Sequence, residues 1–368
     1  MMKRIPLLAM AFLVLGAPLF SQDGPKTTPD GRFTLEIEVP RFGVINQDAT
    51  GTCWSFGTTS FLESEVGRMT GEKVNLSEMY TVRGAYIEKT KRFLKMKGKN
   101  TYGQGGLCHD VIDVIRKYGA VPADVYTGLC NGRRRHNHTE MESLLAGMAK
   151  ALVARRRVSP LWPQALEKVM DVYIGEAPES FDWNGKTYSP KSFSDEVLKL
   201  PYDSYVEVMS FATEPFYKRA ALDVPDNWMH YDRYVNVPVD DMMAAMDHAL
   251  GKGFSVAVDM DVSEPGFAPM KGTAQLPAKL ESGKITDELR KEQFLNKQTT
   301  DDHLMHIVGV ARDKDGKVWY LTKNSWGPVG PYKGYVMMSR PYVALKMLSF
   351  MAHKDGLPKG FLGKIKDS

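Results

Sequence analysis

One cysteine stands among residue types that together can perform nucleophilic chemistry. Cys53 lies in the run NQDATGTCWSF over residues 46–56, and apolar residues at helical spacing follow it. A thiol at a helix N-terminus is expected to be reactive, because the helix dipole and unpaired N–H groups stabilise its thiolate. Gln47 precedes it, and His306 and Asn324 lie far downstream. Thiol, imidazole and carboxamide groups predict nucleophilic acyl transfer.

The positions of His306 and Asn324 allow contact across a hairpin. Two strand-like segments flank the turn signal DKDG at 313–316. A turn centred on Asp315 would place His306 opposite Asn324 on one face, where the carboxamide could orient the imidazole. A centre half a residue earlier would place Lys323 there and turn Asn324 to the other face. The sequence therefore permits this contact without fixing it.

The elements expected to hold these residues are helical in the first half and strand-rich toward the end. Residues 131–235 are predicted to be mostly helical, and so is the apolar stretch that contains Val343, Met347, Phe350 and Met351. Helices are predicted after Cys53, from 75–78 through Phe93, from Val111 to Tyr118 and from Asp240 or Asp241 to Gly251; strands are predicted over 34–39, 254–258, 306–311, 318–322 and 334–338. Together they indicate an α+β protein with two lobes.

The N-terminal residues are typical of a signal for export. MMKR is followed by an apolar stretch through Phe20 that is too short to span a bilayer comfortably. Residues 1–21 are therefore predicted to be a cleaved signal peptide, and residues 22–368 a secreted or periplasmic protein. No second run of about 18 apolar residues is present, so no stable membrane anchor is expected after cleavage.

Charge and cysteine content limit the partners. Lys and Arg number 48 and Asp and Glu 44, so the formal charge is +4. The basic triplets 133–135 and 155–157 are interpreted as solvated helix faces, and nucleic-acid binding is not expected. Cys53 would be the free thiol among three cysteines, with Cys108 and Cys130 a candidate disulfide or two unpaired thiols.

Several motifs recur in the order of a known family. They are TGTCW at 50–54, Gly105-Gly106, YGAVP at 118–122, Leu304-Met305 before His306, NSWG at 324–327 and KGY at 333–335. Over residues 44–340 the chain resembles the papain superfamily, in its bleomycin hydrolase and aminopeptidase C branch. The resemblance implies a papain-like two-lobed α+β fold with large helical insertions. It divides residues 22–368 into a helical lobe (22–130), a helical insertion (131–240) and a β-rich lobe (241–368).

The resemblance also implies roles for individual residues. Cys53 would be the nucleophile, His306 the general base and Asn324 the group that orients it. Gln47 and the Cys53 backbone N–H would form the oxyanion hole. Supporting roles would fall to Gly105 and Gly106, which offer backbone to substrate, to Trp54 beside the nucleophile, and to Trp326, which would shield the His–Asn contact from water.

The implied activity is a cysteine peptidase acting on peptide substrates without a cofactor, most simply an aminopeptidase. In the relatives, the C-terminal carboxylate meets the α-amino group of the substrate, but the tail from Gly356 to Ser368 looks short for that arm. An oligo- or endopeptidase therefore stays open, as does a cell-wall peptide amidase or acyltransferase; an inactive binding protein is disfavoured. The relatives form hexamers, so a homo-oligomer is also open.

A second histidine offers a different chemistry. His303 and His306 together with the cysteines could suggest zinc, but a strand does not place residues i and i+3 on one face, and no Cys-x-x-Cys accompanies them. No metal site is therefore predicted. His303 is interpreted as a loop or flap residue near the site.

Overall fold

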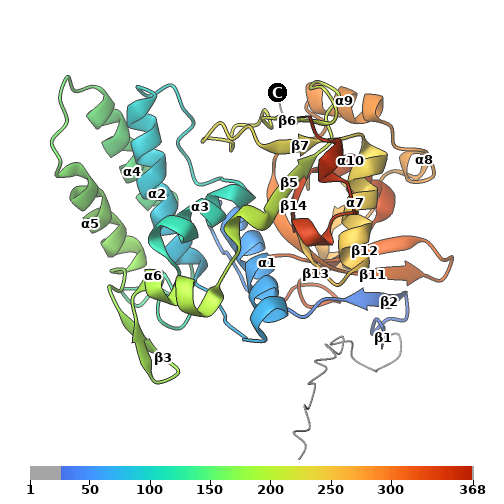
Figure 1. The fold of residues 1–368 in the computed structure, drawn as a ribbon, viewed down its shortest axis with the longest axis horizontal. Coiled ribbons are helices and arrows are strands. Elements are labelled where there is room, and N and C mark those ends of the chain that lie inside the picture. The colour runs from blue at the N-terminus through green and yellow to red at the C-terminus, as the bar shows by residue number, and fades with distance from the viewer. Residues whose placement is uncertain (1–25, 367–368) are drawn as a thin grey trace, which may run out of the picture.

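The computed structural model of this chain describes residues 26–366 (Figure 1). The predicted signal peptide lies outside the described residues, so export stays a prediction. Within residues 26–366, no helix combines the length and the apolar character needed to cross a membrane.

The first half of the described chain is a lobe of α-helices (Figure 1). The helices are α1 (Cys53–Thr70), α2 (Glu78–Lys95), α3 (Cys108–Tyr118), α4 (Thr139–Val153), α5 (Trp162–Ile174) and α6 (Pro190–Phe193). The Ser77 hydroxyl caps α2 by accepting a hydrogen bond from the Tyr80 backbone at 3.1 Å. Gly71 ends α1 in the left-handed conformation, with φ of 76°, which glycine adopts without a steric penalty.

The second half, together with two strands from the N-terminal end, forms a large mixed sheet. Its strands are β1 (Lys26–Thr27), β2 (Phe33–Glu38), β5 (Tyr205–Met209), β6 (Lys218–Ala220), β7 (Tyr234–Asn236), β8 (Val256–Met260), β9 (Phe267–Ala268), β10 (Thr273–Ala274), β11 (His303–Asp313), β12 (Val318–Lys323), β13 (Tyr335–Ser339) and β14 (Met347–His353). Their order is β6-β7-β5-β14-β8-β11-β12-β13-β10-β9, with β2 also paired to β11 and β1 to β2. A separate hairpin, β3 (Phe181–Trp183) and β4 (Lys186–Tyr188), lies beside the helical lobe (Figure 1).

Helices cover both faces of the sheet and fix which side chains point to each. Helix α1 packs between α2 and α3 on one side and β8 and β11 on the other. The opposite face carries α7 (Val239–Gly251), with α8 (Ala278–Glu281), α9 (Asp287–Leu295) and α10 (Arg340–Lys346) nearby. Ala257 and Leu304 belong to the core shared with α1, whereas Val258 and Met305 belong to the core shared with α7. Successive residues of β8 and β11 thus alternate between the two cores.

The α+β class and most predicted elements are confirmed, and two predictions are wrong. Residues 131–235 contain α4, α5 and α6, but the strands β3 and β4 lie between α5 and α6, and β5, β6 and β7 follow. The apolar stretch after Tyr335 is helical only to Lys346, because Met347–His353 form the central strand β14. A run of apolar residues fits a buried strand as well as a buried helix, so this periodicity is ambiguous.

The three cysteines are unpaired, so the candidate Cys108–Cys130 disulfide is not formed. Cys108 is buried at the first position of α3. Cys130 lies in a loop, where its sulfur is 3.4 Å from the carbonyl oxygen of Val172 in α5. The two thiols are thus held by different contacts in the helical lobe.

Candidate active site

Helix α1 carries Cys53 into the middle of the molecule. Residues from Cys53 to Val66 are buried on all sides, because the helix is enclosed by the helical lobe and the sheet. Thr52 precedes the helix and makes no side-chain capping bond; its backbone carbonyl accepts hydrogen bonds from the N–H groups of Ser55 and Phe56. Cys53 retains 8% of its exposed surface. The thiol therefore lies at the end of a fixed, buried helix.

The imidazole that meets Asn324 is His303. His303 Nε2 lies 2.7 Å from Asn324 Oδ1, and this oxygen also accepts a hydrogen bond from the Ser325 backbone at 2.7 Å. An oxygen that accepts both bonds requires the proton on His303 Nε2, which leaves Nδ1 as the acceptor. The Trp326 ring covers the pair, with its centroid 4.7 Å from that of His303. The shielding role predicted for Trp326 thus applies to His303.

His303 lies beside the thiol because the first turns of α1 pack closely against β11. The Cys53 thiol accepts a hydrogen bond from the backbone of Leu304, the residue after His303. A Cβ added at Gly57 would lie 3.0 Å from the Leu304 carbonyl oxygen, so glycine allows the helix and strand to approach this closely. The structure therefore brings together Cys53, His303 and Asn324.

The predicted contact between His306 and Asn324 is wrong. His306 pairs across the hairpin with Lys323, the register that turns Asn324 to the other face. The side chain of His306 is fully buried, and its Nδ1 lies 2.9 Å from the hydroxyl of Ser60 on α1. Burial and the nearby charges of Lys323 and Arg41 hold the pKa of His306 well below its usual range. His306 is thus a neutral, buried residue behind the catalytic helix.

Sequence reasoning missed His303 because its role depends on that register. His303 opens β11, and Asn324 directly follows β12. Side chains on a strand change face at each residue, so His303 and His306, three apart, lie on opposite faces. The same alternation separates the two imidazoles, which therefore cannot act together as ligands of one metal. Among residues 26–366, no group of three or more His, Cys, Asp or Glu side chains could hold a metal ion.

Gln47 is held at the site by two hydrogen bonds. Its Oε1 accepts from the Ser325 hydroxyl at 2.6 Å, and its Nε2 donates to the Thr50 carbonyl at 2.7 Å. A carboxamide nitrogen has two N–H groups, so one remains for a developing oxyanion. Gln47 is 6% exposed, and its backbone also bonds to Ser325. The side chain is thus fixed before substrate arrives.

We expect Gln47→Ala to lower kcat about 10²- to 10³-fold, because one preorganised donor to the oxyanion is lost. Steady-state kinetics on a peptide anilide would measure this. Thr50→Ala, which removes a neighbouring hydroxyl and leaves the Thr50 carbonyl in place, is the matched control and should retain most of the activity. Similar losses in both variants would argue that Gln47 only supports the loop.

Of the two predicted glycines, Gly106 lies beside Trp54 and Gly105 beside Asp226. A Cβ at Gly106 would lie 2.8 Å from Asp110 Oδ2 and 3.0 Å from the Trp54 ring, so no larger residue fits there. The Trp54 indole N–H donates to the carbonyl of Gln104 at 2.8 Å and ties this backbone to α1. Gly105 is covered by a carboxylate, that of Asp226. Its backbone is therefore less open than the prediction assumed.

Electrostatics keep both reacting groups neutral in the unliganded protein. Burial raises the pKa of the Cys53 thiol to about 12; a hydrogen bond from Leu304 opposes this rise, and the carboxyl groups of Asp226, Asp301 and Asp259 add to it. Burial lowers the pKa of His303 to about 4, although its bond to Asn324 works against this. The expected lowering of the thiol pKa at the helix N-terminus is thus wrong, because a dry site and nearby carboxyls outweigh it.

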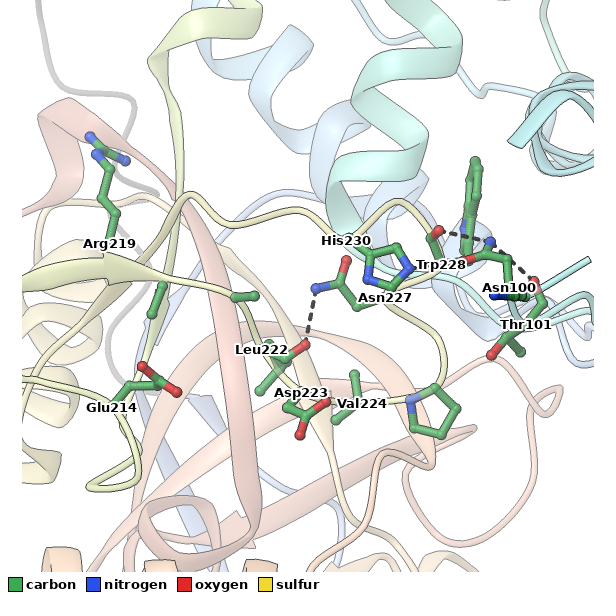
Figure 2. Close-up of a pocket in the computed structure, with 14 residues that line it drawn as sticks. Asn100, Thr101, Glu214, Arg219, Leu222, Asp223, Val224, Asn227, Trp228 and His230 are labelled. Carbon is green, nitrogen blue, oxygen red and sulfur yellow. Dashed lines mark hydrogen bonds between the residues drawn. The ribbon is translucent and has the colours of Figure 1, made fainter. Parts of the chain in front are cut away.

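A separate pocket lies next to the candidate active site, and the candidate catalytic residues do not line it. It has a volume of about 500 Å³ and is bordered by the loop between β6 and β7 and by residues 99–101 (Figure 2). None of Cys53, His303, Asn324 or Gln47 lines it. Its lining residues are Lys99, Asn100, Thr101, Glu214, Arg219, Ala220, Ala221, Leu222, Asp223, Val224, Pro225, Asn227, Trp228 and His230.

The family described as "Peptidase C1-like family" matches residues 21–367 of the chain. The chain belongs to this family. It is therefore a cysteine peptidase, and the predicted papain-like fold is confirmed. Cys53 begins α1 and His303 begins β11.

Curated relatives align with nearly the whole chain. Aminopeptidase C of Streptococcus thermophilus is 23% identical over 375 residues, which cover 88% of this chain and 83% of that protein. Bleomycin hydrolase of Rattus norvegicus is 21% identical over 396 residues, covering 92% and 87%. A crystal structure of PepW from Lactobacillus rhamnosis HN001 superposes with a TM-score of 0.71 at 21% identity, covering 90% and 84%. The chain is thus similar to the first two in sequence and to the third in fold.

Proposed function

We propose that this chain is a cysteine aminopeptidase in which His303, rather than His306, is the general base. The observation that supports this assignment is the 2.7 Å hydrogen bond between His303 Nε2 and Asn324 Oδ1, beneath Trp326 and next to the residue that bonds the Cys53 thiol. This bond leaves His303 Nδ1 free to accept the thiol proton. It also holds the imidazole plane in one orientation.

The reaction proceeds in two acyl transfers. The Cys53 sulfur attacks the substrate carbonyl carbon while its proton passes to His303 Nδ1, and the carbonyl oxygen becomes an oxyanion. Gln47 Nε2 and the Cys53 backbone N–H donate to that oxyanion. The intermediate collapses as the C–N bond breaks; His303 gives its proton to the leaving amine, and Cys53 becomes a thioester. Water, deprotonated by His303, then releases the carboxylic acid and restores the thiol.

The pKa shifts fit attack coupled to proton transfer. A thiol with a pKa raised to about 12 and an imidazole with a pKa lowered to about 4 do not form an ion pair before substrate binds. The proton therefore moves as the sulfur attacks, which requires Nδ1 to be unprotonated at neutral pH. Burial of His303 ensures that condition.

Action at the amino end of peptides is supported by the names of several relatives, which are called aminopeptidases C, G, W and E. In this chain, the tail is tied to another part of the sheet. Lys366 pairs with Lys218, and its backbone N–H donates to the Tyr217 carbonyl at 2.9 Å. Strand β6 is five strands away from β11, roughly 24 Å at the usual spacing. The described tail therefore does not supply an anion beside Cys53.

We expect the enzyme to cleave an aminoacyl anilide with a free amino group at least about tenfold faster than its N-acetyl form, because a charge-assisted contact contributes about 1.5–3 kcal/mol. Measuring kcat/KM on the matched pair tests this. Equal rates would overturn the aminopeptidase assignment and favour an oligo- or endopeptidase. An internally quenched peptide with both ends blocked would then confirm cleavage within a chain.

A further inference from the structure

A segment of the sheet lobe reaches across to the helical lobe near the candidate site. Residues 221–233, here named the strap, leave the sheet after β6 and return at β7. The Asn100 side-chain amide donates to the Trp228 carbonyl at 2.9 Å, and His230 Nε2 lies 3.0 Å from Asn100 Oδ1. The Trp228 indole donates to Asp110 on α3 at 2.8 Å. Figure 2 shows Trp228 and His230 close to Asn100. The strap is thus fastened to the helical lobe.

The strap places a carboxylate directly on the predicted substrate-binding backbone. A Cβ built on Gly105 would lie only 1.9 Å from Asp226 Oδ2, so the Asp226 carboxylate occupies the side of Gly105 where a side chain would stand. The Asp226 backbone N–H also donates to the carboxyl group of Asp301. Asp301 lies two residues before His303 in the chain. Asp226 therefore joins the glycine segment to the start of β11.

A third carboxyl group lies on the neighbouring strand and has no donor. Asp259 on β8 stands opposite Leu304 in the sheet, on the same face as Ala257, and that face looks toward α1. Its exposed fraction is 1%, and among residues 26–366 no donor group satisfies either of its carboxyl oxygens. The neighbouring carboxyl group of Asp301 adds to the rise in the pKa of Asp259. A buried carboxyl without a donor is costly, so a missing partner is indicated.

The charges around these carboxyls point to a cation. Burial raises the pKa of Asp301 to about 7, with Asp226 adding to the rise. Burial and then Asp301 raise that of Asp259 well above its usual range. Lys89 is the cation that acts on Asp226, but its ammonium already donates to the carbonyls of Gly103 and Gly105. The group is therefore short of positive charge.

The cluster lies on the thiol side of the sheet, because Asp259 pairs with Leu304, whose backbone contacts the Cys53 thiol. In an aminoacyl group, the α-nitrogen is two bonds and about 2.5 Å from the carbonyl carbon. A carboxylate that accepts a hydrogen bond from it lies roughly 5 Å from the carbon that the Cys53 sulfur attacks. Asp226, Asp259 and Asp301 are close enough to Cys53 that each raises the pKa of its thiol.

We propose that Asp226, Asp259 and Asp301, here named the acidic cluster, bind the α-ammonium group of the substrate's first residue. This inference rests on the proposed aminopeptidase function and assigns its specificity to three internal carboxyls. A bound ammonium supplies the donors that Asp259 lacks. It also offsets the carboxylate charges that oppose a negative sulfur, so only a substrate with a free amino end favours the thiolate.

The test compares alanine 4-nitroanilide with its N-acetyl form in the wild type and in Asp226→Asn, Asp259→Asn and Asp301→Asn. The ratio of the two kcat/KM values is independent of the amount of folded enzyme. We expect each variant to lower this ratio about 10- to 150-fold, through slower cleavage of the free amine. Asp223→Asn, an exposed carboxylate of the same strap, is the matched control and should leave the ratio unchanged. Melting curves identify variants that do not fold. If Asp259→Asn does not fold, the substrate ratio of the variant at the half-buried Asp226 decides whether the proposal holds.

Each other result overturns the proposal in a distinguishable way. An equal loss of kcat/KM on the free and the N-acetylated substrate would mean that the acidic cluster only maintains the structure of the site. A loss confined to lysine 4-nitroanilide would assign it to a basic side chain. Faster cleavage of Gly-Ala than of Ala anilides would place the ammonium site one residue further away. If the wild-type enzyme cleaves both alanine substrates at equal rates, the proposed aminopeptidase function is refuted. If it cleaves neither substrate, the assigned active site is refuted as well.

Discussion

Glutamine in place of His303 is expected to lower kcat/KM by at least about 10³-fold, whereas His306→Gln should retain activity within about tenfold. Only His303 combines a bond to Asn324 with a position next to the residue that contacts Cys53. His306 instead meets Ser60, so its replacement should chiefly lower the free energy of unfolding, by about 1–3 kcal/mol. Steady-state kinetics and urea unfolding on the two variants separate these effects.

The opposite result is equally clear. If His306→Gln were inactive while its unfolding free energy remained unchanged, and His303→Gln were active, His306 would be the base after all. Asn324→Ala gives an independent check. It should weaken activity in the wild type but add little to His303→Gln, because the carboxamide acts through that imidazole.

Alanine in place of Cys53 should abolish hydrolysis, by about 10⁴-fold or more, while leaving the fold intact. The sulfur forms the covalent intermediate, and the substitution removes only that one buried atom at the start of α1. Cys53→Ser should also be nearly inactive, because a hydroxyl is a far poorer nucleophile at neutral pH. Kinetics under single-turnover conditions would detect any residual rate.

Cys130→Ser is the matched control, since Cys130 lies in a half-buried loop against α5 and should be dispensable. Alkylation of the native wild type by iodoacetamide, followed by mass spectrometry, should abolish activity when Cys53 is modified. If Cys53→Ala retained a tenth or more of the wild-type activity, the assignment of Cys53 as the nucleophile would be wrong.

The local sequence was sufficient to predict those helices and strands whose ends are marked by capping or turn residues. Helices α2 and α3 follow from the Ser77 cap and from apolar residues at helical spacing, and the strands at 318–322 and 334–338 were located within a residue or two. Strands of three residues, such as Lys218–Ala220, are too short to show any periodicity. They form because neighbouring strands pair with them, a cause that lies outside their own sequence.

The histidine was misassigned because the resemblance placed the general base at His306, while the hairpin register that could have excluded it was left open. A hairpin shifted by a single residue exchanges the faces of every side chain, and β11 contains an irregularity between Ile307 and Gly309 that no turn signal reveals. The acidic cluster could not be seen at all, since Asp226, Asp259 and Asp301 come from three segments. Only the sheet pairing and the path of the strap bring them together. Export and oligomeric state stay predictions.

The strap also bears on how the enzyme avoids digesting itself. Since Asp226 rests on Gly105, an extended chain that continues past Cys53 on that side meets a wall fixed to both halves of the molecule. An internal loop, whether in a folded neighbour or in another copy of the enzyme, cannot place its backbone on the sulfur from that direction. Only a loose amino end fits. Autolysis would then be confined to trimming of frayed N-termini.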